Sequence, residues 1–184
     1  EPLSRITEDF CRAWGIDCRV LPMSDDPVPT TVLTPDGALP FQEYFVHQRC
    51  EPVVLGFRFN GVEASSPAPG VLEAIHEAEL LIYCPSNPWV SIGPILAVPG
   101  IREAAAKYPA IAVTPIIGGK AVKGPAAKMY RELGIEPSAL AVARQYGFQG
   151  AGGMLTGFVL DSLDAGSPAG QDSSIASMGL KVLS

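Results

Sequence analysis

Polar residues directly follow three apolar segments of the sequence, at the points where buried strands would end. The first group follows residues 80–84 and comprises Ser86, Asn87, Ser91 and Gly93. Hydroxyl, amide and backbone N–H groups at the start of a helix favour an anion such as a phosphate. Proline, serine and asparagine are also ordinary turn residues, so these residues alone favour a phosphate cradle and a structural turn about equally.

The second group follows the apolar segment 110–114 and comprises Gly118, Gly119, Lys120 and Lys123. Glycines let the backbone approach a phosphate or a nucleobase closely, and lysine ammonium groups balance negative charge. The P-loop pattern GxxxxGK[ST] does not occur in the chain. Since glycine–lysine turns are common, this group by itself is a weak indication of a nucleotide site.

The third group is the acidic pair Asp25 and Asp26, which follows the apolar segment 18–21. Adjacent carboxylates form a solvated turn more often than a metal site. Their position after an expected strand matches that of Ser86, and we therefore expect Asp25 to lie beside the ligand, in a supporting or metal-binding role. His47 and His76 are interpreted as surface histidines without a function.

These polar groups need a parallel sheet to bring them to one edge. Residues 80–84 form an unbroken apolar run, which predicts a strand buried on both faces of such a sheet. Repeated strand-loop-helix units predict an α/β, three-layer Rossmann-like fold with a mainly parallel sheet. Residues 30–60 carry the turn Pro35-Asp36-Gly37 and are predicted to form an inserted antiparallel hairpin, a flap that covers a ligand or makes a homodimer contact.

Periodicity and turn residues predict the remaining elements. A first helix begins at Ser4 as its cap, ends at Gly15 and packs through the apolar stripe Ile6, Phe10, Ala13 and Trp14. Further helices are expected over 70–78, 91–97, 126–133 and 138–146, and strands over 18–21, 53–59, 155–160 and 178–183. Residues 162–177 are rich in small and polar residues, which predicts a mobile loop.

Composition narrows the class of protein. The 184 residues fit one α/β domain, 1–184. The net charge is −6 and the basic residues are scattered, so we expect no nucleic-acid partner. The four cysteines show no metal-ligand spacing and are expected to be reduced, which favours a cytoplasmic protein. No stretch has the length of a membrane helix, and we expect no membrane partner.

Three blocks of the sequence carry a resemblance to a known family. The blocks are LPMSDDPV at 21–28, PSNPWVSIGPILAVPGIR at 85–102 and TPIIGGKAVKGPAAK at 114–128. In their order and spacing they closely resemble the 2-phospho-L-lactate transferases, which complete the core of the deazaflavin coenzyme F420. The resemblance covers essentially the whole chain.

The resemblance implies a reaction, substrates and a metal. A phospholactyl-type group would pass from a guanosine diphosphate-activated donor to the ribityl hydroxyl of a deazaflavin, with release of GMP and with a magnesium ion present. Ser86, Asn87, Ser91 and Gly93 would then hold the donor phosphates. Gly118, Gly119, Lys120 and Lys123 would hold the guanosine or a phosphate, and Asp25 would support the metal.

The resemblance also implies an absence. Family members begin with a glycine-rich strand-loop-helix and end with a last helix, and neither is recognised here. We therefore expect an incomplete piece that is inactive by itself and holds no identifiable general base, with the main metal and deazaflavin contacts elsewhere.

Two other classes of function stay open. The first is a non-enzymatic nucleotide-sugar-binding regulator of the same fold, although such relatives carry a GPGSLYTS-like sequence in place of PSNPWVSIGP. The second is an interaction domain with a vestigial pocket. Neither the acyl group of the donor nor the oligomeric state follows from the sequence.

Overall fold

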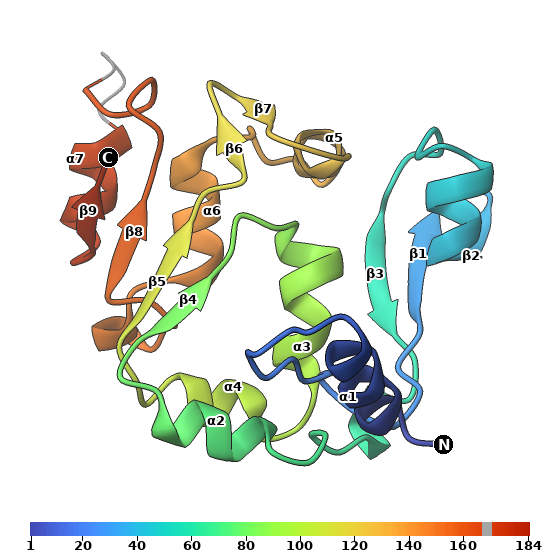
Figure 1. Ribbon diagram of the computed structural model, residues 1–184. Coiled ribbons are helices and arrows are strands. Elements are labelled where there is room, and N and C mark those ends of the chain that lie inside the picture. Colours follow the sequence, from blue (N-terminus) through green and yellow to red (C-terminus); the bar gives the residue numbers. More distant parts are fainter. Residues whose placement is uncertain (167–170) are drawn as a thin grey trace.

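A computed structural model describes residues 1–166 and 171–184 and shows a mixed α/β fold (Figure 1). Its main sheet has four parallel strands in the order β4-β5-β8-β9, and a separate three-stranded antiparallel sheet has the order β2-β1-β3. The parallel strands are β4 (Leu81–Tyr83), β5 (Ala110–Val113), β8 (Gly157–Val159) and β9 (Lys181–Leu183). The predicted α/β class, with a parallel sheet and an antiparallel hairpin, is confirmed.

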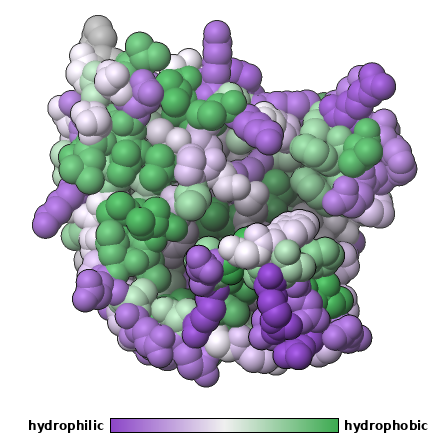
Figure 2. Space-filling view, viewed as in Figure 1, coloured by the Kyte–Doolittle hydropathy of each residue, from purple (hydrophilic) through white to green (hydrophobic). Residues whose placement is uncertain are grey.

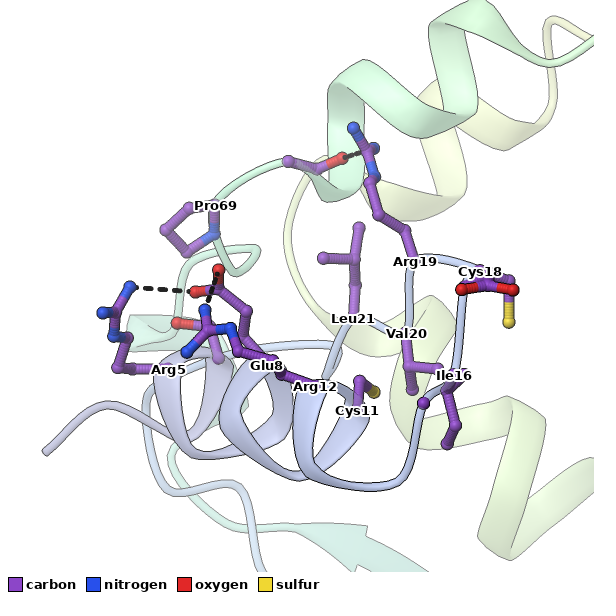
Figure 3. Close-up of a pocket in the computed structure, with 14 residues that line it drawn as sticks. Arg5, Glu8, Cys11, Arg12, Ile16, Cys18, Arg19, Val20, Leu21 and Pro69 are labelled. Atoms are coloured by element: carbon purple, nitrogen blue, oxygen red, sulfur yellow. Dashed lines mark hydrogen bonds and ion pairs between the residues drawn. The ribbon is translucent and has the colours of Figure 1, made fainter.

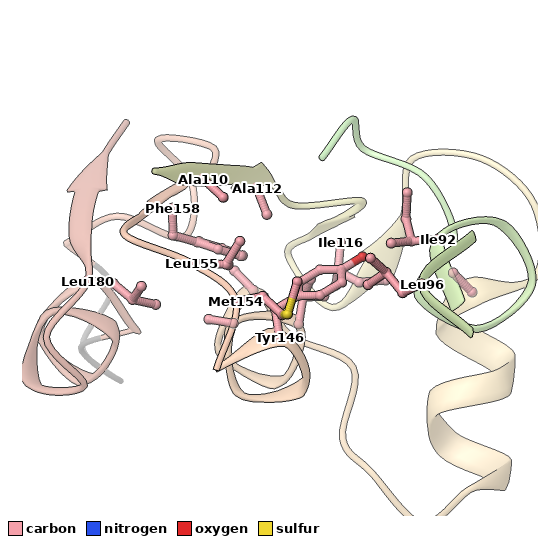
Figure 4. Close-up of a cluster of buried hydrophobic side chains, with 14 of the residues drawn as sticks. Ile92, Leu96, Ala110, Ala112, Ile116, Tyr146, Met154, Leu155, Phe158 and Leu180 are labelled. Carbon is pink, nitrogen blue, oxygen red and sulfur yellow. The ribbon is translucent and has the colours of Figure 1, made fainter. Parts of the chain in front are cut away.

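One face of the parallel sheet forms the main hydrophobic core. Ala110, Ala112 and Phe158 are fully buried there and belong to one cluster with side chains of the connecting helices (Figure 4). The small alanines of β5 leave room for the large side chains opposite, among them Tyr146 and Leu155. The helices of this layer are α3 (Gly93–Ala97), α4 (Ile101–Ala105), α5 (Ala126–Glu132), α6 (Ala139–Tyr146) and α7 (Gln171–Ser177).

The prediction that residues 80–84 are buried on both faces is wrong. β4 is an edge strand, and Ile82 on its outer face is 59% exposed. An unbroken apolar run indicates only that both faces of a strand suit burial. Whether they are buried depends on neighbours, and within the described residues β4 has a partner strand on one side alone, β5.

Residues 30–59 form the antiparallel sheet, with β1 (Thr30–Thr34), β2 (Gly37–Pro40) and β3 (Gly56–Phe59). The short π-helix η1 (Glu43–His47) lies between β2 and β3. A second, smaller core holds this sheet together, because Val32, Tyr44 and Val54 are all fully buried around Met129 of α5. An ion pair adds to the link, since Lys128 and Glu132 of α5 bond the backbone at Pro52 and Val54.

Helix α1 (Leu3–Ala13) differs from the prediction in two ways. It buries none of its residues, and Phe10 is 54% exposed, so the predicted packing of its apolar stripe is wrong. Its N-cap is Pro2 and not Ser4, because the Pro2 carbonyl oxygen accepts the first helical hydrogen bonds, from the N–H groups of Arg5 and Ile6. The Ser4 side chain and N–H bond the Asp25 carboxylate instead. The predicted strand over 18–21 does not form, since that segment has no strand beside it to pair with in the described residues.

The other predicted elements form near their expected positions. The short connecting elements are η2 (Val62–Ala64), α2 (Val71–Glu77), η3 (Pro88–Ile92), β6 (Ile116–Ile117), β7 (Lys120–Ala121) and η4 (Gln149–Ala151). The predicted loop 162–177 is wrong where Gln171–Ser177 forms α7, and its residues 167–170 lie outside the described residues. None of the helices described is long and apolar enough to span a bilayer.

Candidate functional site

Two of the predicted polar groups lie in loops that begin at the same edge of the parallel sheet. β4 and β5 pair in parallel with Tyr83 beside Ala112, so the loops that follow them begin at neighbouring strand ends (Figure 1). The first loop carries Ser86 and Asn87, and the second carries Gly118 to Lys120. The carboxyl edge of an open parallel sheet is where α/β proteins bind ligands.

Asn87 already has a structural task in the first loop. Its Oδ1 accepts hydrogen bonds from the N–H groups of Trp89 (2.9 Å) and Val90 (3.4 Å), which caps η3. Its Nδ2 lies 3.1 Å from the sulfur of Met129. The neighbouring Ser86 is partly buried, and its hydroxyl has no hydrogen-bond partner among the described residues. Of the two side chains, Ser86 is the one free to contact a ligand.

Gly93 is required by close packing as well as suited to a ligand. A Cβ there would lie 3.0 Å from the Pro88 carbonyl oxygen and 3.3 Å from the Phe59 ring. The glycine thus lets the start of α3 pack closely against Phe59 of β3. Gly93 also lines a cavity of about 530 Å³ together with Trp89, Arg102 and other residues, whereas Ser91 is partly buried beside it in η3.

The second loop is a tight hairpin. Ile117 pairs with Lys120 across the two-residue turn Gly118-Gly119, and the φ angles of the two glycines are 55° and 73°. Positive φ at both central residues is what a type I′ turn needs, so the turn by itself explains both glycines. Lys120 and Lys123 are exposed, and no carboxylate lies within ion-pair distance of either among the described residues. The two lysines remain available for a phosphate.

Asp164 joins the same edge and was missed by the sequence reasoning. It follows β8, is 3% exposed, and its carboxylate accepts a hydrogen bond from Gly118 N–H at 3.0 Å. Gln171 Nε2 donates to the same carboxylate at 2.9 Å. The sequence could have indicated Asp164 by its position after a third strand of the same sheet. However, Asp164 lies in the segment 162–177, which was interpreted as a mobile loop. Asp164 holds the glycine hairpin in position from the next strand end.

The acidic pair at Asp25 and Asp26 is engaged in local structure. Both carboxylate oxygens of Asp25 accept hydrogen bonds from Ser4, at 2.6 and 2.7 Å, and Asp26 accepts one from Ser66 N–H at 2.8 Å. Within residues 1–166 and 171–184, no three His, Cys, Asp or Glu side chains lie close enough together to hold a metal ion. The two hydrogen bonds from Ser4 leave lone pairs on the Asp25 carboxylate, and Mg²⁺ is commonly held by one or two carboxylates together with substrate phosphates and water.

Two tyrosines lie against the core beneath the first loop. The rings of Tyr83 and Tyr146 stack with centroids 5.5 Å apart. Burial raises the pKa of the Tyr83 phenol, and the nearby Arg102 guanidinium acts in the opposite direction. Burial also raises the pKa of Tyr146. Both phenols are therefore neutral at pH 7, and neither is suited to act as a base there.

A separate cavity of about 740 Å³ lies between α1 and residues 15–21, away from the sheet edge (Figure 3). Arg5, Arg12 and Arg19 line it, but each already has a partner. Arg5 and Arg12 pair with Glu8 at 3.0 and 2.9 Å, and Arg19 donates to the Gly70 carbonyl oxygen at 3.3 Å. The charges of Arg5 and Arg12 are thus paired with carboxylates, whereas Arg19 is bonded only to a neutral carbonyl oxygen.

Comparison with known proteins gives a consistent result. A family model described as 2-phospho-L-lactate transferase CofD matches residues 1–166. A phosphoenolpyruvate transferase of Streptomyces griseus is 47% identical over 172 residues, which are 90% of this chain and 53% of that protein. A 2-phospho-L-lactate transferase of Methanosarcina barkeri is 43% identical over 138 residues, 75% of this chain and 45% of that protein.

Solved structures agree at the level of the fold. Protein BH3568 from Bacillus halodurans superimposes with a TM-score of 0.60 at 14% identity, covering 99% of this chain and 59% of that one. A second structure of the same protein, described as a member of the UPF0052 family, gives a TM-score of 0.62. The chain spans about half the length of the curated relatives it matches.

Proposed function

This chain belongs to the 2-phospho-L-lactate transferase CofD family, and from that premise we propose that it is part of a transferase of coenzyme F420 biosynthesis. In the proposed reaction a phospholactyl-type group, carrying phospholactate or phosphoenolpyruvate, passes from a guanosine diphosphate-linked donor to the ribityl hydroxyl of a deazaflavin. The hydroxyl oxygen attacks the distal phosphorus, the bond from that phosphorus to the bridging oxygen breaks, and GMP leaves.

The observation that carries the proposal is that two polar loops begin at neighbouring strand ends on one edge of the sheet. The loop of Ser86 and Asn87 and the hairpin of Gly118 to Lys120 follow paired parallel strands. The first offers an unpartnered hydroxyl, and the second offers an exposed ammonium group on a hairpin that Asp164 holds. Donors that are fixed before a diphosphate arrives stabilise the charge that spreads during phosphorus transfer.

We assign roles on this basis. Ser86, Ser91 and Gly93 contact the donor phosphates, while Asn87 acts mainly by holding η3 in place. Lys120 and Lys123 balance phosphate charge, and the turn of Gly118 and Gly119 brings backbone close to the nucleotide. Catalysis by these residues is chiefly positioning and charge stabilisation, without a general base from this chain.

Magnesium is proposed for the whole protein and not for this chain alone. Metal ions commonly neutralise diphosphate oxygens in such reactions. Mg²⁺ at such sites usually takes one or two carboxylates, and its other ligands are diphosphate oxygens and water. Asp25 is a supporting ligand in this proposal.

A titration of the purified chain with GDP and with UDP-glucose tests the nucleotide site. We expect GDP to bind, and we expect Asn87→Asp to weaken it by about tenfold, because the new carboxylate keeps the helix cap and repels the diphosphate. The melting temperature should stay within about 2 °C, since the cap is kept. Asn60→Asp, the same change of charge on the antiparallel sheet, is the matched control and should leave GDP affinity unchanged.

Two outcomes would reject the proposal. Stronger binding of UDP-glucose than of GDP would favour the nucleotide-sugar-binding regulator. Binding of neither nucleotide would return the chain to the class of interaction domains with a vestigial pocket.

A further inference from the structure

A buried carboxylate links the candidate nucleotide site to α7. Asp164 follows β8 and is 3% exposed. Its carboxylate accepts hydrogen bonds from Gly118 N–H at 3.0 Å and from Gln171 Nε2 at 2.9 Å. Gly118 belongs to the turn between β6 and β7, and Gln171 is the first residue of α7. One side chain therefore connects the hairpin proposed for the nucleotide to a helix that has no residue in the candidate site.

Hydrogen bonds compensate the charge of this carboxylate within the described residues. None of the ion pairs found in residues 1–166 and 171–184 involves Asp164. Figure 2 shows apolar surface gathered over the parallel strands, which include β8 directly before it. A buried carboxylate is strongly unfavourable without donors, and bonds to a charged acceptor are stronger than bonds between neutral groups. We therefore expect Asp164 to need the donors of both Gly118 and Gln171.

The amide of Gln171 is held at both of its polar atoms. Its Oε1 accepts a hydrogen bond from Leu140 N–H at 3.1 Å, in the first turn of α6. That N–H is one of those that a helix leaves without an internal partner. The reverse orientation of the amide would set its oxygen against the Asp164 carboxylate and its NH₂ group against an N–H. Gln171 is thus oriented by α6 and presents its donor to Asp164.

α7 has a fixed position, whereas the hairpin depends on its side-chain contacts. Ile175 of α7 is fully buried in the main core. The strands β6 and β7 have two residues each and pair only with one another in the described part of the chain. A two-stranded hairpin is marginally stable at best by itself. Its turn is bonded from two sides, by Asp164 at Gly118 N–H and by the exposed Arg131 at Gly119 O, at 3.2 Å.

From these observations we propose that Gln171 is a positioning residue for the nucleotide. It orients Asp164, and Asp164 in turn fixes the Gly118-Gly119 turn and the strand that carries Lys120. This inference rests on the proposed function, since it takes the hairpin to contact the nucleotide. A ligand that binds the ordered hairpin more tightly also stabilises the contacts that order it, because coupling between two sites is reciprocal. Nucleotide binding and the docking of α7 are therefore coupled.

A nucleotide titration combined with hydrogen exchange tests the coupling on the purified chain. Gln171→Met keeps the length of the side chain and removes both hydrogen-bonding groups. We expect it to bind GDP about tenfold more weakly, because Asp164 loses a donor and the turn is held less firmly. We also expect saturating GDP to slow amide exchange of residues 172–177 by about threefold or more in the original chain and not in the variant. A purely structural role of Gln171 would not produce protection that depends on the nucleotide.

Gln171→Glu adds a dependence on pH that identifies the bond itself. The new carboxylate would lie at hydrogen-bond distance from Asp164, where two negative charges repel each other unless they share a proton. Its GDP affinity, divided by that of the original chain at the same pH, should be about tenfold lower at about pH 8 and should recover at about pH 5.5. This division removes the titration of GDP. Because this variant is compared with itself, it still tests the bond if Gln171→Met unfolds.

Ala176→Gly is the matched control for a loss of helix stability. Ala176 is exposed on α7, and glycine weakens a helix without touching Gln171 or Asp164. α7 should stay docked for most of the time, because Ile175 keeps its place in the core. GDP affinity should therefore stay within about twofold of the original value, while exchange of the α7 amides becomes faster.

The outcomes separate this inference from the proposed function. If the original chain does not bind GDP, the proposed function fails and the coupling fails with it. If the chain binds GDP and Gln171→Met binds it equally well, or if GDP leaves exchange in α7 unchanged, the coupling alone is rejected. Equal weakening by Ala176→Gly would also reject it, because the stability of α7 would then set the affinity and the bond to Asp164 would not.

Discussion

At the scale of the residue, the Tyr83 hydroxyl is buried without a hydrogen-bond partner among the described residues. A buried polar group without a partner typically costs about 1 to 3 kcal/mol. We therefore expect Tyr83→Phe to leave the free energy of unfolding unchanged or to raise it by about 1 kcal/mol. The stacking on Tyr146 needs only the ring and should persist. Urea denaturation of the two proteins measures the difference.

Tyr130 provides the matched control for that variant. Its hydroxyl donates a hydrogen bond to Gln145 Oε1 at 2.6 Å, and the residue is fully buried. Tyr130→Phe removes this bond and should lower the free energy of unfolding by about 1 kcal/mol. Equal loss of stability in both variants would mean that the Tyr83 hydroxyl forms a hydrogen bond in solution, which contradicts this prediction.

Substitutions at Gly118 can distinguish a role in the hairpin turn from a role in nucleotide binding. Its φ is 55° and a Cβ there meets no atom within 4 Å, so a substitution meets backbone strain and no clash. Gly118→Ala should lower stability by about 1 kcal/mol, whereas Gly118→Asn should recover much of it, because asparagine adopts positive φ more readily. If nucleotide approaches this backbone, both variants should bind GDP more weakly.

The result that contradicts this assignment is specific. Recovery of both stability and GDP affinity in Gly118→Asn would show that the glycine serves the hairpin alone. Thermal unfolding and nucleotide titration on the same samples distinguish the two roles.

Individual residue roles were the least predictable from the sequence. Asn87 has the right type for a phosphate ligand, yet its amide caps η3, and a cap looks the same in sequence as a binding residue. Asp25 resembles a metal ligand, but it bonds Ser4 from 21 positions away. The role of Asp164 was not predicted, because its hydrogen bond to Gly118 spans 46 positions of the sequence. Such long-range partners leave no local pattern.

At the scale of the element, α5 connects the antiparallel sheet to the rest of the molecule. Glu132 accepts a hydrogen bond from Val54 N–H at 3.0 Å and pairs with Lys128 at 2.6 Å, and its side chain is only 17% exposed. Glu132→Ala leaves a partly buried ammonium group and a backbone donor without their partner. We expect the free energy of unfolding to fall by about 1 to 3 kcal/mol.

Hydrogen exchange should show which part of the structure Glu132→Ala destabilises. Amides of β1 and β3 should exchange faster in Glu132→Ala, while those of β5 and β8 in the main core should change less. Glu136→Ala removes an exposed carboxylate just beyond α5 and should change neither. Equal loss of protection in both sheets would mean that they unfold as one unit, with no weaker joint at α5.

Elements with local signals were predicted well, and those that depend on absent neighbours were not. The Pro35-Asp36-Gly37 turn and the Ser138 cap of α6 are short-range features, and both elements form near their predicted bounds. Residues 18–21 and the stripe of α1 carry equally clear patterns, but a strand needs a partner and a stripe needs a surface to cover it. The described residues supply neither.

At the scale of the whole molecule, the class of fold was predictable because parallel strands have a distinctive alternation with helices. The sequence blocks at 21–28, 85–102 and 114–128 also indicate the family independently of the fold. Burial could not be predicted in the same way, since an apolar run at β4 suits a central strand and Ile82 is nevertheless 59% exposed. Burial is a property of the assembled sheet, and among the described residues β4 has a neighbouring strand on one side only.

Met129 belongs at once to α5, to the small core and to the contact with Asn87, and it is fully buried. Oxidants such as peroxide reach a methionine sulfur only when it is accessible. Met23 and Met178 are partly exposed and would be oxidised in the native state. Met129 would be oxidised only when the antiparallel sheet opens. A polar sulfoxide there would not pack in the small core, so a single such opening under oxidative stress would keep the antiparallel sheet from closing until the sulfoxide is reduced.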